Sequence, residues 1–148
     1  MKPMATLAAL VLLALPAGAA HAITGCSIAP GAQIAFGAIV PLASSGDADS
    51  NSGGSLVVRC GTDVALPPSL HSSTARQLGG PGGYLPFRLS LVSPGGPDLA
   101  EASPGSPLSV SSDDADHVVT LHARIRAADF AAMPSGAYSG AITLTIEY

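Results

Sequence analysis

Carboxylate and imidazole side chains gather between residues 113 and 122, which makes this stretch the first place to look for metal chemistry. Asp113, Asp114, Asp116 and His117 lie close together, and His122 follows His117 by five positions. Residues five apart on a β-strand point to opposite faces, so the two imidazoles cannot share an ion without a bulge. The acidic run also lacks the ordered spacing of an EF-hand calcium loop. We therefore interpret it as a solvated surface loop and predict neither a metal site nor a cofactor.

Hydrolytic and phosphate-binding chemistry lack their sequence signatures. A serine hydrolase holds its nucleophile on a constrained turn such as Gly-x-Ser-x-Gly, and the chain contains no such segment. The stretch GGPGG at residues 79–83 has no strand–glycine–helix context and precedes no P-loop lysine, so a flexible turn is its simplest interpretation. We predict no catalytic or cofactor-binding residue and expect that the protein is not an enzyme.

Cys26 and Cys60 are the two cysteines of the chain. A zinc site would need two further soft ligands at short spacing, and the sequence supplies none. A chain sent to an oxidising compartment would instead join these cysteines in a disulfide. By the loop-entropy estimate, that disulfide would stabilise the fold by about 3–4 kcal/mol.

Residues 1–22 have the anatomy of a secretory signal peptide. They combine an early positive charge at Lys2, an apolar run from Leu7 to Leu15 and a small-x-small end at residues 20–22. The apolar run is too short to cross a hydrocarbon layer of roughly 30 Å as a helix, and no later segment is long enough either. We therefore predict export, no transmembrane segment and one mature domain over residues 23–148.

The charge and aromatic content of this domain argue against some classes of partner. The full chain has six basic and ten acidic residues, and Lys2 lies in the leader, so the mature domain has a formal net charge of −5. Nucleic acid is not an expected partner, because phosphate binding needs a basic face. Aromatic residues make up 4% of the chain and tryptophan is absent, so no stacking platform for sugars or bases is evident.

Short apolar runs separated by 17 glycines and 13 prolines are typical of an all-β sandwich or barrel. We expect strands at Gln33 to Val40, Gly54 to Cys60, Val64 to Leu70, Tyr84 to Val92, His117 to Arg126 and Ala137 to Tyr148. The last of these places Ile142, Leu144, Ile146 and Tyr148 on one face and polar side chains on the other. Such alternation, with one apolar and one wet face, indicates antiparallel sheets.

Two connections look long for so small a domain. One runs from Ser44 to Ser55 and the other, rich in proline and glycine, from Ser93 to Ser112. Both are expected to be mobile surface segments. A single helical turn is expected at Phe130 to Met133, with Asp129 as its N-cap.

The N-terminal part of the domain contains Cys26, then Phe36-Gly37, then Pro41-Leu42, and finally Cys60. This order resembles the spore coat protein U family, which includes the Csu-type pilins of archaic chaperone-usher pili. The family shows a cysteine, an apolar-Phe-Gly core, a Pro-Leu pair and a strand that closes on a second cysteine. Cys26, Phe36-Gly37, Pro41-Leu42 and Cys60 occupy these positions here.

The C-terminal part shows the same resemblance. LHARIRA at residues 121–127 is similar to the penultimate strand of the family, and MPSGAYSGAITLTIEY at residues 133–148 is similar to its closing segment. The resemblance covers both ends of the mature chain and weakens over residues 62–112.

Membership would imply an incomplete immunoglobulin-like β-sandwich of six to seven antiparallel strands whose final strand comes from a partner. A periplasmic chaperone would supply that strand first, and a neighbouring subunit would then replace it at the outer-membrane usher by β-strand addition. In this scheme Ile142, Leu144, Ile146 and Tyr148 would help line the acceptor groove. The protein would pass through the periplasm and finish at the cell surface, in a pilus or in a spore coat.

The sequence departs from the family pattern in two places. Only Ile23 to Gly25 separate the expected cleavage site from Cys26, a reach of about 10 Å against roughly 30 Å for a strand that fills a groove. We therefore expect a subunit that accepts a strand but donates none, at a fibre tip or in a coat that does not polymerise through donor strands. Pro67-Pro68 would remove two ladder donors and predicts an edge or a bulge.

Two functions remain open from the sequence. The leading one is an exported structural subunit assembled by a chaperone and an usher. The alternative is a self-contained secreted adhesive module that binds through its long loops.

Overall fold

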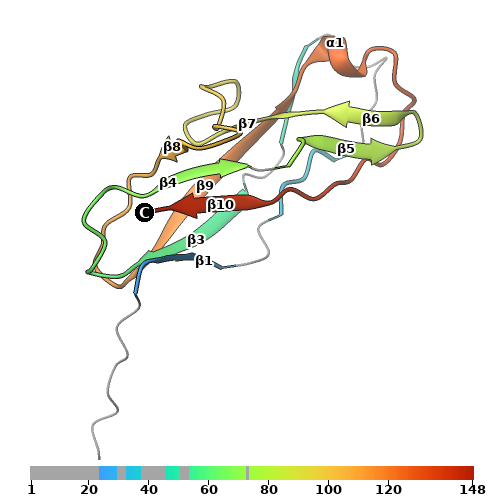
Figure 1. The fold of residues 1–148 in the computed structure, drawn as a ribbon. Helices are drawn as coiled ribbons and strands as arrows, with labels where there is room; N and C mark the ends of the chain where they lie inside the picture. The colour runs from blue at the N-terminus through green and yellow to red at the C-terminus, as the bar shows by residue number, and fades with distance from the viewer. Residues whose placement is uncertain (1–23, 30–32, 38–45, 51–53, 73) are drawn as a thin grey trace, which may run out of the picture.

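Extended backbone dominates the computed structural model, which describes residues 24–29, 33–37, 46–50, 54–72 and 74–148 (Figure 1). Its strands are β1 (Cys26–Ile28), β2 (Ala48–Asp49), β3 (Gly54–Cys60), β4 (Ser69–Ser72), β5 (Gln77–Gly80), β6 (Gly83–Pro86), β7 (Arg88–Ser90), β8 (Ser106–Pro107), β9 (Asp116–Ile125) and β10 (Leu144–Glu147). A short helix, α1 (Ala127–Phe130), follows β9. The predicted all-β fold is confirmed.

The first sheet is built around the long strand β9. β3 pairs with it antiparallel from Gly54 opposite Leu121 to Arg59 opposite Asp116, and β1 adds to the outer edge of β3. β2 and β7 pair with the C-terminal end of β9. The expected alternation is present, because the buried positions of β3 and β9 fall on every second residue.

The second sheet has the order β10-β4-β8, and β5 and β6 form a separate hairpin. An isolated bridge between Gly79 and Ser139 joins that hairpin to the chain before β10. The closing segment therefore runs first beside β5 and then beside β4 (Figure 1).

Apolar side chains from both sheets meet in the interior. The main cluster consists of Leu56, Val58, Cys60, Leu70, Leu89, Leu99, Leu108, Leu121 and Ala123. Leu99 and Leu108 belong to the segment from Ser93 to Ser112, which also contributes β8. The expectation that this segment is only a mobile surface loop is wrong, because two of its leucines are core residues.

The described part of the other long connection is also more ordered than expected. Its β2 pairs with β9, and the Asp49 carboxylate accepts hydrogen bonds from the Arg124 guanidinium at 2.5 and 2.9 Å. These bonds hold the pKa of Asp49 below its usual range. Residues 44–45 and 51–53 of this connection lie outside the described residues, as do the expected signal peptide and Pro41-Leu42.

Two strand predictions are met closely. Gly54–Cys60 forms β3 with the expected bounds, and the expected strand at His117 to Arg126 is shifted by one residue in β9. The run from Tyr84 to Val92 is divided, because β6 pairs with β5 whereas β7 pairs with β9.

Other strand predictions need correction. The strand expected from Val64 begins only at Ser69, directly after Pro67-Pro68, which offer no N–H to a ladder. The described residues 33–37 contain a single bridge position, at Ala35, and residues 38–40 lie outside the described residues. Regular pairing in the last expected strand is confined to β10.

The glycine stretch and the helical turn also differ from expectation. Gly79 and Gly80 belong to β5 and Gly83 begins β6, so the flexible turn is reduced to the residues between them. α1 begins at Ala127, and Asp129 lies inside its first turn, where its carboxylate accepts a hydrogen bond from Arg126 Nε at 2.8 Å. Asp129 is therefore not the N-cap.

Candidate functional site

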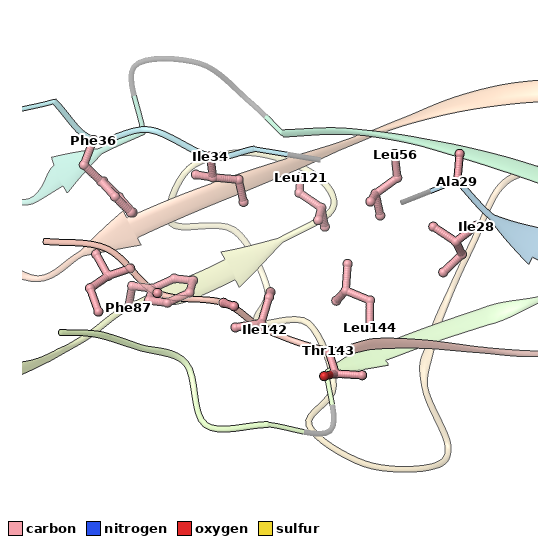
Figure 2. Close-up of a pocket in the computed structure, with 13 residues that line it drawn as sticks. Ile28, Ala29, Ile34, Phe36, Leu56, Phe87, Leu121, Ile142, Thr143 and Leu144 are labelled. Atoms are coloured by element: carbon pink, nitrogen blue, oxygen red, sulfur yellow. The ribbon is translucent and has the colours of Figure 1, made fainter. Parts of the chain in front are cut away.

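An apolar groove opens between the two sheets, with a volume of about 510 Å³. It is lined by Ile28, Ala29, Ile34, Phe36, Leu56, Leu78, Phe87, Leu121, Gly140, Ala141, Ile142, Thr143 and Leu144. None of these described residues is charged, and Thr143 alone contributes a polar side-chain atom. Figure 2 shows side chains of both layers pointing into the shared space.

Each sheet contributes one wall of the groove. Leu56 on β3 and Leu121 on β9 line it from the first sheet and are 3% and 1% exposed. Ile28 on β1 stands on one side, and Ile142 and Leu144 stand on the other (Figure 2). For Leu56 and Leu121, strand alternation explains the arrangement, because every second side chain of β3 and β9 is directed inward.

Phe36 and Phe87 pack together in the groove wall. Their rings meet edge to face, with centroids 6.2 Å apart and planes inclined by 66°. This geometry places the positive edge of one ring against the negative face of the other. The ring contact joins Phe36, which precedes β2, to Phe87, which lies between β6 and β7. Both residues line the groove.

The groove is bordered by two strand edges. Within the described residues β1 pairs only with β3, and β10 pairs only with β4. In an antiparallel strand, alternate residues direct their N–H and C=O groups to opposite sides. Half of these backbone groups in β1 and β10 therefore face away from their sheet partners.

The edge of β10 that faces β4 is anchored by polar contacts. The Glu147 carboxylate accepts hydrogen bonds from the Ser69 hydroxyl at 3.3 Å and from the Gly105 N–H at 3.2 Å. The Ser103 side chain and the Gly105 N–H, in that order, hold the pKa of Glu147 below its usual range. His71 Nδ1 lies 3.7 Å from the same carboxylate. This side of β10 is thus attached to its sheet.

The Cys26–Cys60 disulfide, expected from the sequence, is present and fixes β1 to β3. Just before it, Gly25 is buried and its N–H donates to both carboxylate oxygens of Asp63 at 3.1 Å. The ring of Tyr148 lies against Gly25, so that a Cβ placed there would be 2.5 Å from two ring carbons. The first and last described strands are therefore in contact at this end.

The sequence singled out four residues for the groove, and the structure separates them into two groups. Ile142 and Leu144 line it. Ile146 and Tyr148 do not line it: Ile146, like Ile142 and Leu144, packs against the main core cluster, and Tyr148 covers Gly25.

The facing wall was missed by sequence reasoning. Ile28, Ile34 and Phe36 complete the groove from the N-terminal part of the chain. In the sequence, Ile34 and Phe36 alternate with the smaller or polar residues Gln33, Ala35 and Gly37, and this alternation was an available signal for their inward direction.

The acidic stretch is engaged in local pairs. His117 Nε2 lies 2.8 Å from Asp113 Oδ1, and this contact is the main reason that the pKa of Asp113 lies below its usual range. Arg59 Nε donates to Asp114 Oδ1 at 3.3 Å. Among the described residues, no three histidine, cysteine or acidic side chains are grouped so as to hold a metal ion.

Comparison with known proteins places this chain in one family. The model of the Spore Coat Protein U domain matches residues 12–145. No curated protein and no solved structure matches the chain. In the part of the chain that the structure describes, no helix has the length and apolar character needed to cross a membrane. Since the match spans most of its length, the chain belongs to the Spore Coat Protein U domain family, a family of structural pilus and coat subunits rather than of enzymes.

Proposed function

We propose that this protein is an exported subunit whose groove accepts an extended β-strand from a partner, which completes an immunoglobulin-like sandwich. The observation that carries the proposal is the apolar groove bordered by the edges of β1 and β10. An inserted strand would bury its inward side chains on Leu56, Leu121 and Ile142 and would hydrogen-bond along these edges. Apolar burial and main-chain hydrogen bonds together are the basis of strand addition.

Family membership supports pilus or coat subunits as partners, and the proposal extends this to a chaperone and an usher. A periplasmic chaperone would supply the first strand, and a neighbouring pilus or coat subunit would replace it at an outer-membrane usher. An open groove with free strand edges also invites unwanted pairing, so transient cover during export has a physical purpose.

The N-terminus supports a role as acceptor only. If the leader is removed after Ala22, the residues before Cys26 are Ile23, Thr24 and Gly25, and Gly25 is already held by Asp63 and covered by Tyr148. A segment this short does not reach across another groove. Mass spectrometry of the exported protein should find a mature start near Ile23. A start that leaves ten or more residues before Cys26 would contradict the acceptor-only role.

Groove occupancy is tested by co-expression with a periplasmic chaperone of the chaperone-usher type from the same organism. We expect the chaperone to co-purify with the wild-type chain at one to one and to protect it from protease. Ala141→Asp should abolish this complex, because Ala141 is exposed yet lines the groove, and an inserted strand would bury the new charge.

Val118→Asp is the matched control, since Val118 is exposed on β9 and does not line the groove. It should leave the complex intact. A wild-type chain that stays monomeric and resists protease without a chaperone would instead favour a self-contained adhesive module. A dimer dissociated by Ala141→Asp would indicate that a second copy fills the groove.

A further inference from the structure

The groove ends before β10 does. On its β10 side the lining residues run from Gly140 to Leu144, and Ile146 and Tyr148 are not among them. On the opposite side the lining includes Ile28 and Ala29 but not Cys26. On both sides, therefore, the lining residues stop before the chain reaches Gly25 and Tyr148.

A specific contact closes that end. β1 and β10 lie side by side there, and the Tyr148 ring occupies the space that a side chain at residue 25 would fill. Gly25 has φ +74°, a conformation that favours glycine, and its N–H is held by Asp63. The ring therefore rests on a backbone position that is fixed and has no side chain of its own.

The contact of the Tyr148 ring with Gly25 is weak. Tyr148 remains 64% exposed, so its ring buries little area on Gly25. The interaction free energy scales with the buried apolar area, and such a one-sided contact is open to displacement. The disulfide beside it would keep β1 in place if the ring were displaced.

We propose that Tyr148 is the end stop of the groove and sets the register of the incoming strand, an inference that rests on the proposed function. With the ring on Gly25, the groove along Gly140 to Leu144 holds a strand of about five residues, with about three inward side chains. A longer strand advances past Leu144 only if the ring leaves Gly25. Tyr148 thereby discriminates between donor strands by length and register.

The test uses two fluorescent peptides of alternating valine and threonine with a lysine tail, of about five and about nine residues. The chain is refolded with each peptide, and affinity is measured by fluorescence anisotropy. For the wild type we expect the two affinities to agree within about twofold. In Tyr148→Ala the longer peptide should gain about tenfold or more over the shorter, because it can bury further valines beyond Leu144.

Two control variants separate the effect of the aromatic ring at residue 148 from a general effect of losing a tyrosine. Tyr148→Phe retains the ring and should behave as the wild type. Tyr84→Ala removes another exposed tyrosine, outside the groove lining, and should also behave as the wild type. Hydrogen exchange of the wild-type chain adds a readout without any substitution: either peptide should protect amides of residues 140–144 and leave those of Ile146 and Glu147 unchanged.

The outcomes distinguish the end-stop role of Tyr148 from strand acceptance, the function on which it rests. Binding of both peptides with the same length dependence in the wild type and Tyr148→Ala overturns the end stop and leaves strand acceptance standing. A wild-type chain that already prefers the longer peptide by about tenfold, or gains protection at Ile146 and Glu147, overturns it as well. If neither peptide binds the wild type or any variant, strand acceptance fails and the end stop fails with it.

Discussion

At the scale of single residues, Arg76 shows how a charge is accommodated in the interior. Its side chain is almost fully buried, and its guanidinium donates to the Ser72 hydroxyl at 2.8 Å and to the carbonyls of Leu99 and Ala100 at 2.5 and 3.0 Å. Burial is the main cause that lowers the pKa of Arg76. The residue thus ties the segment from Ser93 to Ser112 to the neighbourhood of β4.

Replacing this guanidinium should cost stability. Arg76→Met leaves the buried Ser72 hydroxyl and the buried Leu99 carbonyl without this donor, while the Ala100 carbonyl still accepts from the Ser72 N–H. We expect a loss of about 2–4 kcal/mol in the free energy of unfolding. Urea denaturation measures it. Arg88→Met is the control, because Arg88 is half exposed and pairs with Asp98 at 3.3 Å, and it should change stability by less than about 1 kcal/mol. Equal effects of both variants would show that Arg76 does not anchor the segment.

Glu147 predicts a dependence of stability on pH. The pKa of its carboxyl group is lower in the folded chain than its usual value, chiefly through hydrogen bonds from Ser103 and Gly105. A depressed folded pKa stabilises the fold above the unfolded pKa of about 4.3, and this contribution is lost as the pH falls through the folded value.

Urea midpoints of the wild type and Glu147→Gln should therefore differ most near pH 7 and converge below about pH 4. Glu101→Gln serves as the control, since Glu101 is highly exposed, and it should show no such convergence. A difference between wild type and Glu147→Gln that stays constant over this range would contradict the assigned contacts.

At the scale of elements, β1 depends on the disulfide. It has three residues and pairs along a single edge, with β3, which is too little to hold a strand by itself. Without the disulfide, the wall of the groove that carries Ile28 would loosen.

The double variant Cys26→Ser/Cys60→Ser should lose about 3–4 kcal/mol of unfolding free energy and bind strand peptides less tightly. Denaturation and anisotropy measure the two effects. Reduction of the wild type by dithiothreitol should reproduce both, and an unchanged peptide affinity after reduction would show that β1 holds its place without the bond.

Element boundaries were predictable where pairing is regular. Gly54–Cys60 keeps one partner on each edge and alternates cleanly, so its sequence pattern and its structure agree. The run from Tyr84 to Val92 alternates as well, but its two halves pair with different strands. Alternation reports which face is apolar and carries no information about which strand lies alongside.

At the scale of the whole molecule, strand completion should appear as a gain in stability. A ligand that binds only the folded state stabilises it by about 2.7 kcal/mol at a concentration 100 times its dissociation constant. The thermal midpoint of the wild-type chain should therefore rise steadily with added valine–threonine peptide. A peptide of the same length with glutamate in place of valine should have no effect, and a rise with both peptides would indicate binding outside the apolar groove.

The sequence by itself determined the features that depend on neighbouring residues or on very few residues. An all-β fold follows from alternation and breakers, the disulfide from two cysteines, and the apolar face of the last strand from Ile142 and Leu144. The resemblance of both ends of the chain to the spore coat protein U family agrees with the family model that matches residues 12–145.

The tertiary structure alone decided which distant residues meet. It brings Ile28, Ile34 and Phe36 opposite Ile142, buries Leu99 and Leu108 from an irregular segment, and sets Tyr148 on Gly25. These contacts join residues far apart in the chain, and their partners are chosen by packing and pairing across the sheets rather than by local pattern. That is why the sequence reveals one wall of the groove, whereas its opposite wall and the contact of Tyr148 with Gly25 become visible only in the fold.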